Sequence, residues 1–308
     1  MHKNLLLKVL CQARRRRPTT PRRASFIRKL CTHTEILEQR MLLAAEPLTQ
    51  VDSAFFGSAA FGESKTPSIS LDGQLIVFQS NAENLVPNDV NGESDVFLFN
   101  RATNTVSLVS VSLDGTAAGR CNEYSAPVIS PDGRYVAFES RSENALVAGI
   151  KGDAYYLRDL QLGTTLLLTP NADGTGAAIV GLYGISFAAD GRSVLFVSTG
   201  TNAIDLSHNL TGDAVSGGNI FKRDLQTNLT SLVSIDQSGK GGGIFPGGGV
   251  FFTVNFATSA NGRYVTFLSD SSNYVANDNN NQGDVFLRDT LNGTTNMESN
   301  IGVAVLLR

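Results

Sequence analysis

The chain has 308 residues, of which 42% are hydrophobic, and it contains 30 glycines and no tryptophan. This composition is typical of a turn-rich globular protein and excludes a fibrous or wholly disordered chain. Residues 1–40 carry 11 of the 25 lysines and arginines and two of the 28 acidic residues, which leaves 14 basic and 26 acidic side chains, a net charge of −12, for the remainder. The negative charge of this remainder argues against a surface that binds nucleic acid or anionic membranes, and it is compatible with the binding of cations.

The first segment, residues 1–46, contains arginines at 14–17 and at Arg22 and Arg23, and it ends in a short apolar run. This composition predicts an export leader that takes no part in the fold. Its end, LEQRMLLAA from Leu37, resembles the planctomycete-type LEPR-XLL leader, which implies a periplasmic, cell-surface or extracellular location. A nucleic-acid-binding arm is the alternative interpretation of the arginines. No run of apolar residues reaches the roughly 18 of a membrane helix, so we expect no transmembrane segment.

Residues 47–308 contain four copies of one motif, in which a turn dipeptide precedes a short apolar strand. The second copy, from Ser130 to Ser140, reads SPDGRYVAFES. Asp-Gly or Asn-Gly supplies the positive φ of a tight hairpin, and a run rich in Val, Phe and Tyr favours a strand. The four turns are at Asp72, Asp132, Asp190 and Asn261. Self-similarity at such a period predicts a repeat architecture.

Each copy continues with a second apolar box and a third, more polar one. The second boxes are DVFLFN from Asp95, AYYLRD from Ala154, NIFKRD from Asn219 and DVFLRD from Asp284. The third box, such as Thr105 to Ser110, alternates polar and apolar residues as an exposed outer strand does. Four short antiparallel strands, with the second apolar on both faces, are what a propeller blade requires. We therefore predict an all-β fold, a β-propeller of about four four-stranded blades at 67–110, 127–170, 185–235 and 256–300.

The blades could form a small closed ring, an open arc or part of a larger ring. Two segments are candidates for the outer strand of the last blade, Leu48 to Ser53 and Thr294 to Arg308. The early segment keeps the polar and apolar alternation, whereas Ile301 to Leu307 is apolar throughout. Pairing the two ends of the chain would also remove an exposed edge. We therefore expect Leu48 to Ser53 to close the ring on the last blade.

The repeats resemble the WD40-like (PD40) units of TolB-type propellers, in the secreted variant where SPDGRYVAFxS is followed by a polar loop and DVFLRD. The resemblance covers nearly everything after residue 46. It implies the fold and leaves the function open, because such propellers act as interaction platforms, as accessory domains of peptidases and occasionally as lyases.

A polar loop with one spacing of oxygen side chains follows the second strand of the first and last blades. The side chains are Asp89, Asn91 and Asp95 in the first blade and Asp278, Asn280 and Asp284 in the last. Positions one, three and seven of a tight loop suit Ca²⁺, whose six to eight oxygen ligands can be completed by carbonyls and water. The second blade has Gly149-Ile150-Lys151-Gly152 in place of this loop. The alternative interpretation is that these residues only form turns and cap backbone groups.

Few other residues point to chemistry. His208 is the only histidine after the leader and no Gly-x-Ser-x-Gly elbow is present, so no catalytic residue can be named. Cys121 is the only cysteine after the leader, which excludes a disulfide framework in the propeller and suggests a buried thiol. Arginine–aspartate pairs end the third strand of three blades, and their recurrence favours a structural pairing or turn cap over a ligand-binding ring. These pairs are Arg158–Asp159, Arg223–Asp224 and Arg288–Asp289.

Taken together, these patterns favour a secreted or cell-surface propeller that acts as a protein- or ligand-binding or scaffolding module. Its expected partner is a protein or a cell-envelope glycan rather than a nucleic acid. The alternative is a propeller hydrolase or lyase that acts on extracellular polysaccharide or peptide. Calcium is the one candidate cofactor.

Overall fold

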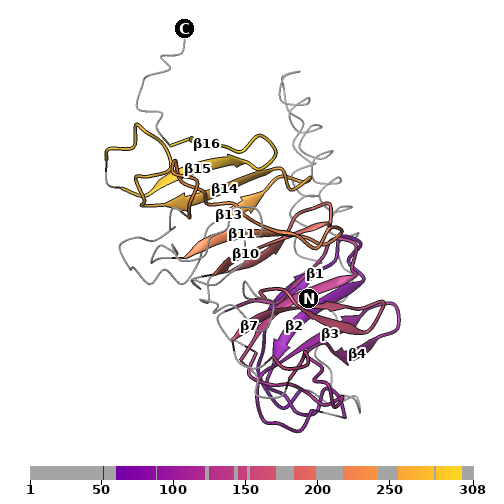
Figure 1. The fold of residues 1–308 in the computed structure, drawn as a ribbon. Coiled ribbons are helices and arrows are strands. Elements are labelled where there is room, and N and C mark those ends of the chain that lie inside the picture. Colours follow the sequence, from indigo (N-terminus) through magenta and orange to yellow (C-terminus); the bar gives the residue numbers. More distant parts are fainter. Residues whose placement is uncertain are drawn as a thin grey trace, which may run out of the picture. The chain divides into compact units, whose positions relative to one another are not determined.

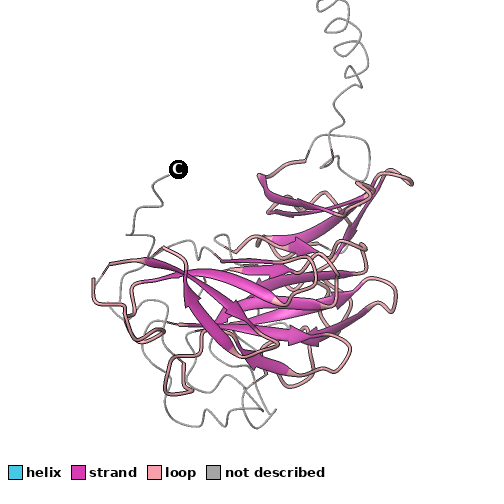
Figure 2. Ribbon diagram, turned by 90° about the horizontal axis from the view of Figure 1, so that it is seen from above, coloured by secondary structure: helices cyan, strands magenta, loops and turns pink. Residues whose placement is uncertain are grey.

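The computed structural model divides into two units, Met1–Gln50 and Val51–Arg308. The structure describes residues 51, 60–87, 89–121, 125–141, 145–150, 153–170, 184–198, 218–241, 256–280 and 282–299. The leader predicted at 1–46 lies outside these ranges. The described residues form sixteen strands and no helix (Figure 2). Accordingly, this part of the chain contains no helix that is long and apolar enough to cross a membrane.

The strands form four antiparallel sheets, each made of four strands consecutive in the chain (Figure 1). Blade 1 contains β1 (Ser64–Ile69), β2 (Leu75–Ser80), β3 (Asp95–Asn100) and β4 (Thr105–Leu108). Blade 2 contains β5 (Val128–Ile129), β6 (Tyr135–Ser140), β7 (Ala154–Asp159) and β8 (Thr164–Leu167). Blade 3 contains β9 (Ile185–Phe187), β10 (Ser193–Ser198), β11 (Asn219–Asp224) and β12 (Thr230–Leu232). Blade 4 contains β13 (Phe256–Thr258), β14 (Tyr264–Ser269), β15 (Asp284–Asp289) and β16 (Thr294–Met297). The prediction of an all-β fold with four four-stranded propeller blades is confirmed.

The turn between the first two strands of a blade is specified by its own side chains. In blade 2, Asp132 Oδ1 accepts hydrogen bonds from Ser130 Oγ at 2.5 Å and from the N–H of Arg134 at 3.1 Å. Ser130 Oγ accepts the N–H of Tyr135 at 2.8 Å. Gly133 has a φ of 73°, a conformation that costs little only without a Cβ. The motif Ser-Pro-Asp-Gly thus starts β6 at a fixed point.

In blades 1 to 3 the central strands bury both faces, because each of these blades packs against the next one. Val77 and Val96 of blade 1 share one apolar cluster with Val136, Phe138 and Tyr156 of blade 2. Similar clusters join blade 2 to blade 3 and blade 3 to blade 4. This packing explains why β2, β6 and β10 read as nearly continuous apolar runs. The fourth strands β4, β8 and β16 alternate exposed and half-buried residues, as expected for outer strands.

The prediction for the outer strand of the last blade is wrong. β16 takes that place and pairs with β15 from Phe286↔Met297 to Asp289↔Thr294. Of the segment Leu48 to Ser53 only Val51 is described, and it packs against the cluster of blade 1 that contains Phe78. A tight turn brings β16 beside β15, whereas pairing with Val51 would close a loop of roughly 240 residues at a larger entropic cost.

Candidate functional site

The loop before the third strand begins with the same turn in three blades. In each, a backbone N–H donates to the carbonyl oxygen three residues earlier. The pairs are Asp89 to Val86 at 3.4 Å, Ile150 to Val147 at 3.0 Å and Asp278 to Val275 at 3.4 Å. The third strand then begins at equivalent residues, since Asp95, Ala154 and Asp284 each pair with the last serine of the second strand. Asp89, Ile150 and Asp278 therefore occupy one structural position.

Asp89 is the most unusual residue of the blade 1 loop. It is 1% exposed, and among the described residues no donor reaches either carboxylate oxygen with hydrogen-bonding geometry. Burial, and next the carboxylate of Asp95, raise the pKa of Asp89 to about 7. The nearby N–H of Asn91 opposes this rise only in part, and Glu83 adds to it. The position holds a carboxylate that the described protein leaves without a neutralising partner.

Asp95, by contrast, accepts three hydrogen bonds. Its Oδ1 accepts hydrogen bonds from Ser110 Oγ at 2.6 Å and from the N–H of Gly119 at 2.9 Å. Its Oδ2 accepts one from Nδ2 of Asn91 at 2.9 Å. The side-chain oxygen of Asn91 accepts the N–H of Glu93 at 2.8 Å, which makes it an Asx turn. Turn capping therefore accounts for Asn91 and does not account for Asp89.

Blade 4 repeats this arrangement. Asp278 is 6% exposed and its Oδ1 has no hydrogen-bond partner among the described residues. Burial and the Asp284 carboxylate raise the pKa of Asp278. Asn280 donates from Nδ2 to Asp284 Oδ2 at 2.9 Å and accepts the N–H of Gln282 at 2.8 Å. Ser299 Oγ donates to Asp284 Oδ1 at 2.5 Å, as Ser110 does to Asp95.

The structure thus brings each predicted trio together in one loop. In the described part of the chain, no group of three His, Cys, Asp or Glu side chains has the arrangement of a metal site. A cation at either loop would therefore also need amide, carbonyl or water oxygens. The sequence pattern identified these loops, but it did not separate the aspartate that has no partner from the residues that cap the turn.

The arginine–aspartate pairs are structural, as predicted. Asp159 Oδ1 caps the turn after β7 by accepting two backbone N–H groups, at 2.9 and 3.0 Å. Arg158 points to the other face of the strand and donates to Thr165 Oγ1 at 3.1 Å. Arg223 and Arg288 make the equivalent bond to a threonine of the fourth strand, at 2.8 and 3.0 Å.

Cys121 lies against the blade 1 loop, because its N–H donates to the carbonyl oxygen of Ser94 at 2.9 Å. Cys121 is free and buried as expected, and burial raises the pKa of its thiol. His208 lies outside the described residues.

A second candidate site is the face of blade 4 that points away from blade 3. Val285 and Leu268 pair across β15 and β14, and they are 41% and 38% exposed. The equivalent pairs of blades 1 to 3 are 0% exposed, because the next blade covers them. They are Val96 with Gln79, Tyr155 with Glu139 and Ile220 with Val197. Val285 and Leu268, with Ala257 and Thr266, line a hollow of about 420 Å³.

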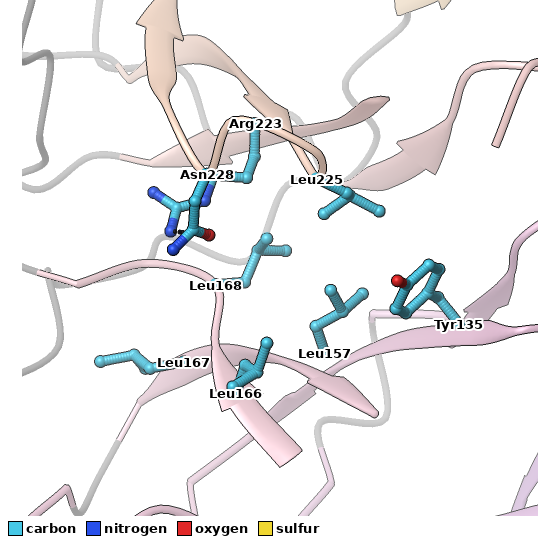
Figure 3. Close-up of a pocket in the computed structure, with 8 residues that line it drawn as sticks. All are labelled: Tyr135, Leu157, Leu166, Leu167, Leu168, Arg223, Leu225 and Asn228. Atoms are coloured by element: carbon cyan, nitrogen blue, oxygen red, sulfur yellow. Dashed lines mark hydrogen bonds between the residues drawn. The ribbon is translucent and has the colours of Figure 1, made fainter. Parts of the chain in front are cut away.

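A smaller pocket of about 140 Å³ lies between blades 2 and 3 (Figure 3). Leucines 157, 166, 167 and 168 form much of its lining, and Figure 3 shows Arg223 and Asn228 together at one end. Arg223 donates to Asn228 Oδ1 at 2.5 Å, so its guanidinium is already engaged. This pocket offers an apolar lining without a residue poised for proton transfer.

Comparison with known proteins places the chain beside propellers only at the level of the fold. No family model and no curated protein matches it. TolB from Acinetobacter baumannii is 15% identical with a TM-score of 0.41, over 77% of this chain and 44% of that one. The β-propeller domain of the Trilobed protease from Pyrococcus furiosus is 12% identical with a TM-score of 0.43, over 77% and 57%. An oligogalacturonate lyase from Vibrio parahaemolyticus is 10% identical with a TM-score of 0.43, over 78% and 53%. The chain spans about half the length of these structures, and its resemblance to PD40 repeats and to the LEPR-XLL leader stays a prediction.

Proposed function

We propose that the chain is an exported binding or scaffolding module that takes up a protein partner on the exposed face of blade 4. One observation carries this proposal: Val285 and Leu268 are 41% and 38% exposed at positions that are 0% exposed in the three other blades. Exposed apolar patches on a folded surface mark interaction sites. Covering this one would remove apolar area from water at about 25 cal/mol per Å².

The partner that suits this face is a protein that presents an apolar β-sheet surface. Such a surface covers the equivalent face in the other blades, as when Val197 and Ile220 of blade 3 share a cluster with Phe267 and Phe286 of blade 4. Five of the six side chains that line the hollow are apolar, and only Thr266 offers a hydrogen-bonding group to sugar hydroxyls. A protein therefore suits the face better than a cell-envelope glycan.

The proposed cellular location of this binding rests on the predicted leader. Residues 37–45 resemble an LEPR-XLL leader, so the proposed module would meet its partner in the periplasm, at the cell surface or outside the cell.

The test is capture from the native envelope fraction with the full chain and two variants. Val285→Asp with Leu268→Asp places charge on the proposed surface. Leu291→Asp is the control, because Leu291 belongs to the same blade and is 73% exposed in the turn before β16. We expect a protein that the wild type and the control retain and that the double variant loses, with all three showing the same circular dichroism spectrum.

Three results would contradict the proposal. Capture that is equal for the double variant and the wild type would place the binding surface elsewhere. Self-association of the wild type, abolished in the double variant, would make the occupant a second copy of the chain. Turnover of extracellular polysaccharide or peptide by the purified chain would favour the hydrolase or lyase.

A further inference from the structure

We infer that the Asp89–Asp95 loop of blade 1 and the Asp278–Asp284 loop of blade 4 each bind a calcium ion, and that the corresponding loop of blade 2 does not. The inference is independent of the partner proposed for blade 4, because it depends on other side chains. Its starting point is a carboxylate with no partner inside the described protein.

The first step concerns charge. Asp89 is 1% exposed and neither carboxylate oxygen has a hydrogen-bond donor among the described residues. Asp95, which is also buried, and Glu83 add like charge around it. Arg120, in the connection between β4 and β5, pairs with Glu93 at 3.5 Å. A buried carboxylate in this position needs a cation or a proton.

The second step compares blades. Where blades 1 and 4 have Asp89 and Asp278, blade 2 has Ile150, which is buried in an apolar cluster with Leu146. Where they have Asp95 and Asp284, blade 2 has Ala154. The same turn therefore forms without either acid. In these three blades, either both positions carry an aspartate, as in blades 1 and 4, or neither does, as in blade 2. This is expected if the two aspartates of a pair bind one ligand.

The third step identifies the ligand. Each loop offers carboxylate oxygens as ligands. In blade 1, neither oxygen of Asp89 has a hydrogen-bond partner among the described residues, and Oδ2 of Asp95 accepts one hydrogen bond, from Asn91. Hard oxygen donors in an irregular loop suit Ca²⁺, whose coordination is flexible, better than Mg²⁺, which demands near-ideal octahedral geometry.

An ion in blade 1 would also act on the chain that leads to blade 2. Asp95 accepts the N–H of Gly119, and Asn91 donates to the carbonyl oxygen of Ala117 at 3.2 Å. Gly119 and Ala117 belong to the connection between β4 and β5. Calcium bound at Asp89 and Asp95 would therefore fix the β2–β3 loop against this connection.

The experiment is isothermal titration calorimetry of CaCl₂ into the full chain, with MgCl₂ as the competing ion. We expect two sites for the wild type, with Kd of about 10⁻⁴–10⁻³ M, which is the range of extracellular calcium modules. Asp89→Asn and Asp278→Asn should each leave one site, and the double variant none. The control Asp190→Asn should keep two, because Asp190 is an exposed turn residue whose bond to the N–H of Arg192 asparagine can also accept.

A second variant guards against a loss of folding. Asp89→Ile places in blade 1 the residue that blade 2 has after the same turn and keeps the buried hydrogen bonds of Asp95, so it should fold and lose one site. No heat at millimolar calcium for a folded wild type, or two sites in the Asp89→Asn and Asp278→Asn double variant, would overturn the inference. Equal heats from magnesium and calcium would overturn the choice of ion.

Discussion

Arg134 Nη2 lies 2.8 Å from Asp159 Oδ2, and this ion pair joins the start of β6 to the turn that follows β7. The same relationship recurs in blade 4 between Arg263 and Asp289 at 2.7 Å. In both blades the arginine follows the Asn-Gly or Asp-Gly turn and lies over the next tyrosine ring, with 4.8 Å to its centroid. Two hairpin turns at one end of each blade are thereby tied together.

The first prediction separates the two partners of this pair. Arg134→Ala should lower the free energy of unfolding by at most about 1 kcal/mol, because the arginine is one-third exposed and the pair is screened. Asp159→Ala should cost about 1–3 kcal/mol, since it also leaves two backbone N–H groups uncapped. Urea unfolding of both variants measures the difference. Equal losses would mean that the ion pair, and not the cap, stabilises the turn.

The second prediction concerns acid. The hydrogen bonds from Arg263 hold the pKa of Asp289 well below its usual range. A depressed pKa in the folded state contributes stability above the unfolded value of about 3.9, and this contribution is lost as the pH falls toward the folded pKa. In an NMR titration, Arg263→Gln should move the pKa of Asp289 upward. The variant should also lose less stability than the wild type between pH 4 and the acid limit of folding. An unchanged Asp289 titration would contradict this account.

The third prediction concerns a buried hydroxyl. Tyr156 is fully buried against Phe138, with 6.0 Å between ring centroids, and its hydroxyl has no hydrogen-bond partner among the described residues. Tyr156→Phe should therefore raise the free energy of unfolding by about 1 kcal/mol. Phe138→Ala should lower it by about 3–5 kcal/mol because it leaves a cavity. Destabilisation by Tyr156→Phe would indicate that a bound water satisfies the hydroxyl.

The fourth prediction tests the turn. Gly133 has a φ of 73°, and a Cβ there would lie 2.9 Å from Cδ1 of Leu75 in blade 1. Gly133→Ala should cost about 1–2 kcal/mol from the left-handed backbone alone. Gly283→Ala is the matched control, because its added Cβ would make only an ordinary contact of 3.8 Å with Leu268. Equal melting temperatures for the two variants would show that the turn relaxes at Gly133.

Much of the fold was predictable because it is encoded locally and repeated. Asp-Gly turns and apolar runs such as Tyr135 to Ser140 specify hairpins without knowledge of the tertiary structure. The start of blade 1 was harder, since the blade was predicted from residue 67 whereas β1 begins at Ser64. The strand passes Pro67 through an irregularity between Lys65 and Ser68, with Thr66 at a φ of 52°.

Features that depend on distant neighbours were not predictable. The sequence could show that Asp89 and Asn91 share a loop. Only the packing of the folded chain determines that Asp89 is buried without a hydrogen-bond partner among the described residues while Asn91 caps the turn. Val285 reads like Ile220, Tyr155 and Val96, and its greater exposure depends on which described residues pack against that face. The outer strand was misassigned because the alternation in Leu48 to Ser53 was compared with the apolar run Ile301 to Leu307, whereas β16 ends at Met297, before that run.

The one-sided packing of blade 4 also determines how the chain loses its structure. Blade 2 is held between two neighbours, whereas the described contacts of blade 4 reach only blade 3. In an array stabilised by nearest-neighbour interfaces, the unit with one interface opens most often. Amide protons of β14 and β15 should therefore exchange with solvent deuterium sooner than those of β6 and β7. A partner that covers Val285 and Leu268 would then stabilise the whole array, because it would slow the opening of blade 4 that leads to global unfolding.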